Sequence, residues 1–112
     1  MKASNKSKLT PEALELVAAR FRALSETARL RLIMALKSGE KSVTELVDET
    51  ALSQANASRH LQHLSNVGIL SRRKEGLQVL YSIADRSIFN LCEQVCGSVE
   101  EVHEKRVRAF RR

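Results

Sequence analysis

The stretch SQANASRHLQHLSNVGILSRRKEGLQVLY, residues 53–81, contains the two signals that decide the fold. The first signal is a helix that Ser53, a good N-cap residue, begins and Gly68 ends. Apolar residues recur inside it at spacings of four and three, at Ala57, Leu61 and Leu64. This spacing predicts an amphipathic helix over residues 53–66 with one buried stripe.

The rest of this helix surface is polar, and no Asp or Glu occurs between Ser53 and Ser71. Amide, hydroxyl and cationic side chains can bond base edges or phosphates in a major groove, whereas a carboxylate facing phosphate costs binding energy. The candidate DNA contacts are Gln54, Asn56, Ser58, Arg59, His60, Gln62 and His63. Two of them have an alternative, because His60 lies next to the buried Leu61 and can pack inside, and His63 can simply be exposed.

The second signal is a change of the apolar period to two after Gly68, which predicts a β-hairpin. Its first strand and tip are basic, with Arg72, Arg73 and Lys74 before an expected turn at Glu75-Gly76. Such a hairpin can place cations beside phosphates or reach into the minor groove. A hairpin that is only exposed to solvent is the alternative that this feature alone leaves open.

Three helices are expected before residue 53. Ser42 and Glu45 form a capping box for a helix ending near Thr50, and the three residues that follow match the short turn of a helix-turn-helix. Ser25 is expected to cap a helix that runs through Leu36. Thr10 followed by a proline predicts the start of the first helix. The residues expected to be buried on that first helix are Leu14, Val17, Ala18 and Phe21.

A last helix is expected from about Asp85. Its apolar side and the two cysteines of the chain fall on one arc. The members of the arc are Ile88, Leu91, Cys92, Val95, Cys96, Val99, Val102 and His103. An apolar stripe of this length in a chain of 112 residues indicates that the helix packs against a partner.

Composition and charge limit the possible classes. The chain has 112 residues with 43% hydrophobic content, which is enough for one domain. We expect this domain over residues 11–104, between a disordered basic tail at residues 1–10 and a second basic tail at residues 105–112. The ends of the chain supply all of the net charge of +6, because residues 9–103 contain eleven cations and twelve anions, a net charge of −1. Within that body, residues 53–81 have four cations and one acid, whereas residues 85–104 have one cation and five acids. This sorting favours a DNA-binding face with an acidic far side.

Neither a membrane-spanning run nor a signal peptide is evident, so we expect a cytoplasmic chain without membrane association. An enzyme is not expected, since no nucleophile motif, phosphate loop or HExxH motif occurs. A winged helix that binds protein instead of DNA would be expected to place acids or large apolar residues at Gln54, Asn56, Ser58 and Arg59, and it stays as an alternative.

Three segments together resemble the ArsR/SmtB family of small bacterial metal- and redox-responsive repressors, over roughly residues 12–104. They are FRALSETARLRL at residues 21–32, LSQANASRHLQHL at residues 52–64 and GIL at residues 68–70. The resemblance implies a mainly α fold with a β-hairpin wing (α+β), a winged helix-turn-helix with four helices, the hairpin and a fifth helix. It also implies a recognition helix over residues 53–66 and a wing over residues 72–79.

The same resemblance implies a homodimer formed through residues 11–21 and 85–104. Such a dimer would bind double-stranded DNA at an inverted-repeat operator, with its recognition helices in successive major grooves about 34 Å apart. It would block a promoter until an inducer binds.

Cys92 and Cys96 allow two interpretations. They can be small apolar side chains packed in the dimer interface, which leaves a regulator without a small-molecule inducer. Alternatively, thiols one helical turn apart can bind a soft ion or be persulfidated or oxidised, and a structural disulfide is not expected in a cytosolic protein. The candidate species are zinc, copper(I), arsenite and a persulfide.

A zinc site would need more than this pair of cysteines, because zinc takes four ligands. His103 is the nearest candidate, but it lies about 10 Å along the helix from Cys96, so only two subunits together could complete the site. The known sites of the family are mostly absent. Val47 and Glu49 are in the segment where other members have Cys-x-Cys, and Asp85-Arg86-Ser87 lacks the histidine of the zinc sensors.

Overall fold

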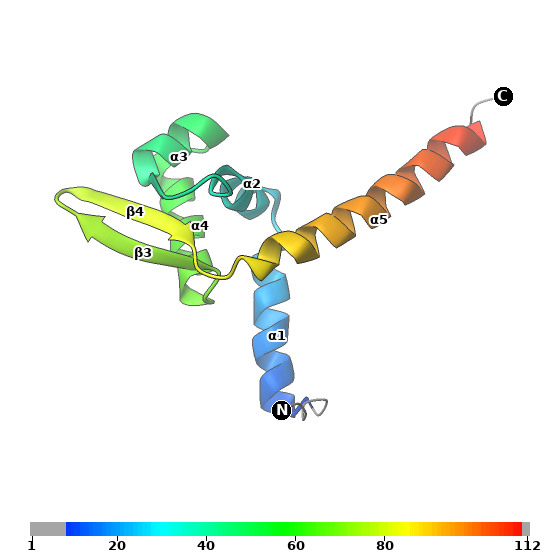
Figure 1. The fold of residues 1–112 in the computed structure, drawn as a ribbon, viewed down its shortest axis with the longest axis horizontal. Helices are drawn as coiled ribbons and strands as arrows, with labels where there is room; N and C mark the ends of the chain where they lie inside the picture. Colours follow the sequence, from blue (N-terminus) through cyan, green and yellow to red (C-terminus); the bar gives the residue numbers. More distant parts are fainter. Residues whose placement is uncertain (1–8, 111–112) are drawn as a thin grey trace.

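The structure of the protein is a computed structural model that describes residues 9–110. Its elements are α1 (Pro11–Ala23), α2 (Thr27–Ala35), β2 (Lys41–Ser42), α3 (Val43–Thr50), α4 (Gln54–Asn66), β3 (Leu70–Glu75), β4 (Gln78–Ile83) and α5 (Ser87–Phe110), as Figure 1 shows. The predicted order of four helices, a hairpin and a fifth helix is confirmed. The two-residue strand β2 was not predicted, because it is too short to show an alternating pattern.

Most of the predicted helix starts are confirmed by their caps. Thr10 Oγ1 accepts a hydrogen bond from the Ala13 amide at 3.1 Å, and Ser53 Oγ does the same for Asn56 at 3.1 Å. Ser42 and Glu45 form the expected capping box. The predicted cap at Ser25 is wrong: its hydroxyl donates to the Arg22 carbonyl at 2.7 Å, at the end of α1.

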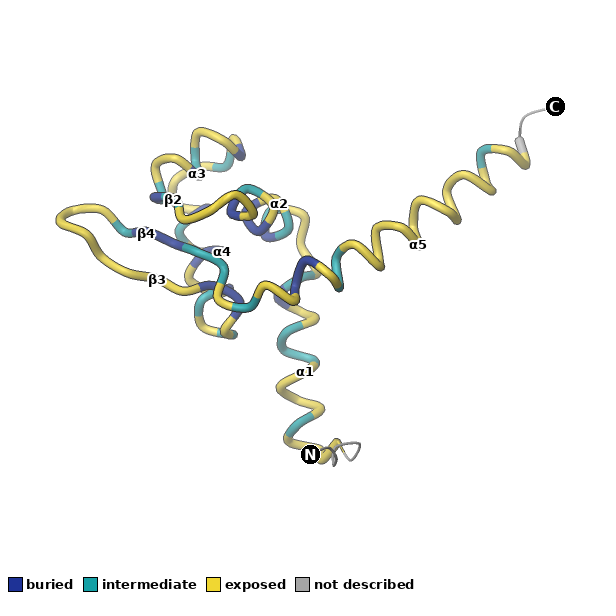
Figure 2. Tube along the Cα trace, viewed as in Figure 1, coloured by how far each residue is buried: buried dark blue, intermediate teal, exposed yellow. Residues whose placement is uncertain are grey.

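The core lies between α2, α3, α4 and the sheet, as the dark blue segments of Figure 2 show. Its fully buried large side chains are Leu32, Ile33, Leu36, Leu46, Leu61, Leu64 and Ile69. The first turn of α5 adds Ile88 and Phe89, of which Phe89 was missing from the predicted apolar arc. Burying each such side chain stabilises the fold by about 1.5–3 kcal/mol before entropy is subtracted.

The sheet is antiparallel, with strand order β2-β4-β3. Glu75 pairs with Gln78, so the loop residues of the wing are Gly76 and Leu77. The turn therefore lies one residue beyond the predicted Glu75-Gly76. Gly76 has a φ of 63°, a left-handed conformation that glycine adopts without a Cβ clash.

Helices α1 and α5 project from the body in different directions, away from the wing (Figure 1). The radius of gyration of 17.2 Å exceeds the roughly 13 Å of a compact chain of this length. Of the residues predicted to be buried on α1, Ala18 is half-buried, whereas Leu14, Val17 and Phe21 are exposed within one chain. Val95, Val99 and Val102 of α5 are exposed as well. Both helices thus have apolar surface that the described part of the chain leaves exposed.

The ends of the chain differ from the predicted division. Helix α5 continues through Phe110, so the basic residues from Lys105 to Arg108 belong to this helix and not to a separate tail. The predicted tail at residues 1–10 lies outside the described residues except for Leu9 and Thr10. Among the described helices, none is long and apolar enough to cross a membrane.

Candidate functional site

Helix α4 presents a polar face because its apolar stripe is fixed in the core. Ala57, Leu61 and Leu64 are fully buried, which turns the opposite side of the helix outward. The exposed members of the predicted DNA face are Gln54, Asn56, Arg59, Gln62 and His63, and Ser58 is half-buried. Arg59 Nη2 donates to Asn56 Oδ1 at 3.1 Å, so these two side chains are already oriented on this face.

His60 does not belong to the exposed face. It is only 4% exposed, and its Nδ1 lies 3.2 Å from Arg29 Nη1. Because arginine can only donate, Nδ1 is the acceptor and the imidazole is neutral. Burial first, and then the cations Arg59 and Arg29, lower the pKa of His60. The predicted DNA contact at His60 is therefore wrong, and the alternative of internal packing is confirmed.

The wing presents its cations on two different sides. Side chains alternate along a strand, so Arg72 and Lys74 lie on one side of β3 and Arg73 on the other. Arg73 donates to both carboxylate oxygens of Glu40 at 2.8 Å, and this bond holds the pKa of Glu40 below its ordinary value. Among the described residues neither Arg72 nor Lys74 has an ion-pair partner. These two side chains are the wing cations free to meet phosphate.

The turn between α3 and α4 sets the direction in which the exposed polar face of α4 points. Ala51 ends α3 in the left-handed conformation with φ 62°, and Ser53 then caps α4. Arg31 Nη1 of α2 donates to the Thr50 carbonyl at 2.9 Å, so the turn is also fixed from the body. The predicted three-residue turn of a helix-turn-helix is confirmed.

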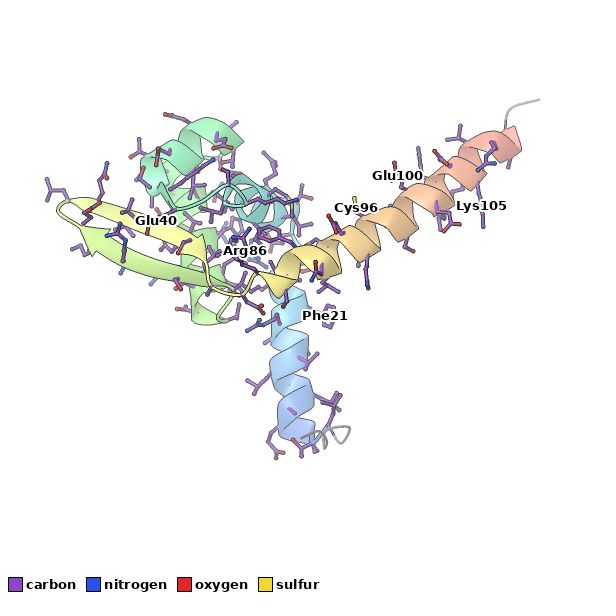
Figure 3. All side chains as sticks on the ribbon, in the orientation of Figure 1. Phe21, Glu40, Arg86, Cys96, Glu100 and Lys105 are labelled. Carbon is purple, nitrogen blue, oxygen red and sulfur yellow. The ribbon has the colours of Figure 1, made fainter. Side chains whose placement is uncertain are left out.

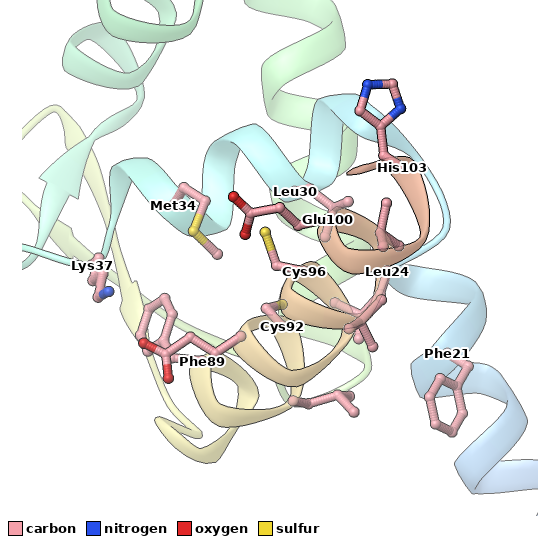
Figure 4. Close-up of a pocket in the computed structure, with 14 residues that line it drawn as sticks. Phe21, Leu24, Leu30, Met34, Lys37, Phe89, Cys92, Cys96, Glu100 and His103 are labelled. Atoms are coloured by element: carbon pink, nitrogen blue, oxygen red, sulfur yellow. The ribbon is translucent and has the colours of Figure 1, made fainter. Parts of the chain in front are cut away.

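A groove of about 830 Å³ separates α2 from α5 and contains both cysteines (Figure 4). Its apolar lining includes Leu24, Leu30, Met34, Phe89, Val95 and Val99. Cys92 is half-buried and Cys96 is exposed. Burial, and then the neighbouring Cys96, raise the pKa of the Cys92 thiol. His103 and Glu100 lie at the far end of the same groove, and Figure 3 shows Glu100 and Cys96 along α5.

Within the described residues, no group of three or more His, Cys, Asp and Glu is arranged to hold a metal ion. The thioether of Met34 on α2 lines the groove together with the cysteines (Figure 4). Sequence reasoning missed Met34, because its distance of 58 positions from Cys92 hides the proximity.

The comparison with known families and proteins agrees with this geometry. The family model for "Bacterial regulatory protein, arsR family" matches residues 26–72. A cadmium resistance transcriptional regulatory protein of Staphylococcus aureus, a CadC homolog, is 39% identical over 87 residues, which cover 77% of this chain and 72% of that protein. The chain belongs to the ArsR family. It is therefore a winged helix-turn-helix DNA-binding regulator, and the resemblance in its sequence is confirmed.

The share of a relative's length that this chain matches differs between family members. A probable mercury resistance operon repressor of Streptomyces lividans is 35% identical over 71 residues, which span 63% of this chain and 57% of that protein. Among solved structures, the homodimeric DNA-binding domain of a possible ArsR-family regulator from Mycobacterium bovis has a TM-score of 0.76 at 28% identity, covering 92% of this chain and 95% of its own. The AntR antimony-specific repressor has a TM-score of 0.73 at 28% identity, with coverages of 93% and 96%.

Proposed function

We propose that this ArsR-family member is a homodimeric repressor that binds an inverted-repeat operator through α4 and the wing. The observation that supports this most directly is the acid-free, exposed face of α4, on which Arg59 is already oriented by Asn56. Arg72 and Lys74 add phosphate contacts, which give affinity that falls with salt. We propose a binding role rather than an enzymatic one, in the cytoplasm, where bacterial DNA lies.

A homodimer is supported by the two uncovered apolar helices. The exposed valines of α5 and the exposed Leu14, Val17 and Phe21 of α1 are surfaces that a second copy would bury. The Mycobacterium bovis relative is homodimeric. Binding to successive major grooves requires the two α4 helices of such a dimer to lie about 34 Å apart.

Replacing Arg59 with alanine is expected to weaken operator binding by about 1–3 kcal/mol, roughly 5- to 150-fold in Kd. The side chain is exposed, and its removal leaves the buried stripe of α4 unchanged. The operator can be selected by the wild-type protein from a randomised duplex library and the Kd measured by fluorescence anisotropy. We also expect relaxed preference at one operator position, if Arg59 contacts a base.

The matched control is Arg106→Ala, which removes the same charge from an exposed position near the far end of α5. Its operator affinity is expected to stay within twofold of wild type. Equal affinities of Arg59→Ala and wild type would contradict the assignment of α4 as the DNA-contacting helix.

For the inducer, we propose capture of a soft, thiol-reactive species at Cys92 and Cys96. Thiolates and thioethers favour soft ions, and both thiols and the Met34 thioether line one groove. This groove lies beside the uncovered face of α5, so a species bound there can change how two copies pack. Copper(I) and arsenite fit two thiols and a thioether best, because these sulfur donors favour soft ions. A persulfide formed on the cysteines is the alternative within the same proposal.

Titrating the reduced protein with zinc, copper(I), arsenite and a polysulfide, with thiol counting and intact mass as readouts, tests this proposal. We expect stoichiometric capture of one soft species, loss of capture in Cys92→Ser and Cys96→Ser, and release of the selected operator. His103→Gln distinguishes a ligand from a packing residue, since only a ligand would change the captured stoichiometry. Absence of capture at micromolar concentrations would mean that the cysteines only pack the interface and that the regulator has no inducer at this pair.

A further inference from the structure

Arg20 connects three elements that are far apart in sequence. It lies on α1, and its Nη1 donates to Asp85 Oδ2 at 2.7 Å, just before α5. Its Nη2 donates to the carbonyl of Val67 at 3.0 Å, and Val67 is the C-cap residue of α4. The planar guanidinium has donors in a fixed fork, so two acceptors on different elements define its position.

The end of α4 is shaped to receive this arginine. Gly68 has a φ of 87°, and a Cβ at that position would lie 3.1 Å from Arg20 Nη2. An alanine there would be strained by its backbone and would also press on the guanidinium. Gly68 thus allows the chain to turn at the end of α4 and leaves room for the arginine that joins α4 to α1.

Arg29 makes a second connection, deeper in the protein. It is 7% exposed, and its Nε and Nη2 donate to the carbonyls of Ala23 and Arg22 at 2.7 and 3.2 Å. These carbonyls belong to the last turn of α1, where the helix dipole favours a cation. From there, Nη1 reaches His60 Nδ1 in the middle of α4 at 3.2 Å. Its carboxylate partner Glu26, at 3.4 Å, is more than half exposed and only screens the charge in part.

The two connections meet α4 on its inner side, one at its middle and one at its end. His60 and Val67 are seven residues apart, or about 10 Å along the helix. Two fixed points at this separation set the tilt of a rigid helix, and the fully buried Ala57, Leu61 and Leu64 restrict its rotation about the line that joins them. Arg59 is the immediate neighbour of His60, so a rotation of α4 at His60 moves the DNA-contacting face directly.

We propose that Arg20 and Arg29 are positioning residues for DNA recognition, which tie the dimer helix α1 to the recognition helix α4 without touching DNA. The proposal rests on the proposed roles of α4 in DNA binding and of α1 in the dimer. Any rearrangement of α1 between the subunits is then passed to α4 through these two guanidinium groups. Uncoupling α1 from α4 should lower the affinity for the specific operator and leave the phosphate contacts unchanged.

The test uses Arg20→Gln, because Arg20 is partly exposed and the carboxylate of Asp85, which loses its partner, is partly exposed as well. Arg22→Gln is the matched control, since it removes an exposed arginine from the same helix. Three quantities are measured for each protein: the Kd for the duplex selected by the wild type, the Kd for a scrambled duplex of equal length and composition, and the slope of log Kd against log salt. Thermal unfolding and sedimentation verify that the variants are folded dimers.

For Arg20→Gln we expect about tenfold weaker binding of the selected duplex, the size of one charged hydrogen bond. The Kd for the scrambled duplex and the salt slope should equal those of the wild type, and Arg22→Gln should match the wild type throughout. Arg29→Lys, which keeps the charge but loses the fork, should show the same pattern if it is folded. A merely structural effect would weaken both duplexes equally, and either that result or an unchanged Kd for the selected duplex would overturn the proposal. If the wild type itself selects no duplex, the proposed function fails instead.

Discussion

Replacing Val99 with aspartate is expected to turn the dimer into a monomer. Val99 is 61% exposed on the apolar side of α5. In a two-fold dimer each substitution occurs twice, so two carboxylates would enter an apolar interface. Leaving charges unpaired there costs several kcal/mol, which raises the dissociation constant by about a thousandfold or more.

Sedimentation velocity at micromolar protein measures this effect. Gln94→Asp is the matched control, because it adds the same acid to an exposed position outside the cysteine groove. We expect the Gln94 variant to remain dimeric and the Val99 variant to sediment as a monomer that no longer binds the selected operator. A Val99 variant that stays dimeric would show that this part of α5 is not in the interface.

Replacing Leu61 with alanine is expected to lower the free energy of unfolding by about 2–5 kcal/mol. Leu61 is fully buried on the inner side of α4, and the substitution removes apolar contacts and leaves a cavity next to the other core residues of α4. This loss is a large fraction of the roughly 5–15 kcal/mol that keeps such domains folded.

Leu77→Ala is the same chemical change at the tip of the wing, where the leucine is fully exposed. Its free energy of unfolding is expected to stay within about 0.5 kcal/mol of wild type. Urea unfolding of all three proteins at one protein concentration, followed by circular dichroism, gives the comparison. Similar losses for both variants would contradict the assignment of the core.

Local signals in the sequence were sufficient for most of the architecture. The caps at Thr10, Ser42 and Ser53 depend on bonds between residues three apart, and the stripe of α4 depends on helical period alone. The wrong prediction of a cap at Ser25 also concerns a local bond. The hydroxyl of Ser25 could cap α2 or bond back to α1, and the sequence does not decide between the two.

Long-range side-chain contacts were not predictable. The bond between Arg73 and Glu40 joins residues 33 positions apart. Because of this bond, Arg73 is not among the wing cations that are free to contact phosphate. Arg29 and His60 are 31 positions apart, and their bond explains why a polar residue of α4 faces inward. Periodicity assigns a residue to a face, but it does not say which distant donor will meet it there.

The length of α5 has a mechanical consequence. With 24 residues it is about 36 Å long, yet among its described residues only Ile88, Phe89 and Leu91 of the first turns join the hydrophobic core. A rotation of about 5° near Ser87 would displace the distant end of the helix by roughly 3 Å, because the displacement grows with the distance from the pivot. The cysteines lie near that pivot, within the first ten residues of the helix. A small species bound to them would need to shift the backbone very little to change the distance between the DNA-binding parts of the two subunits.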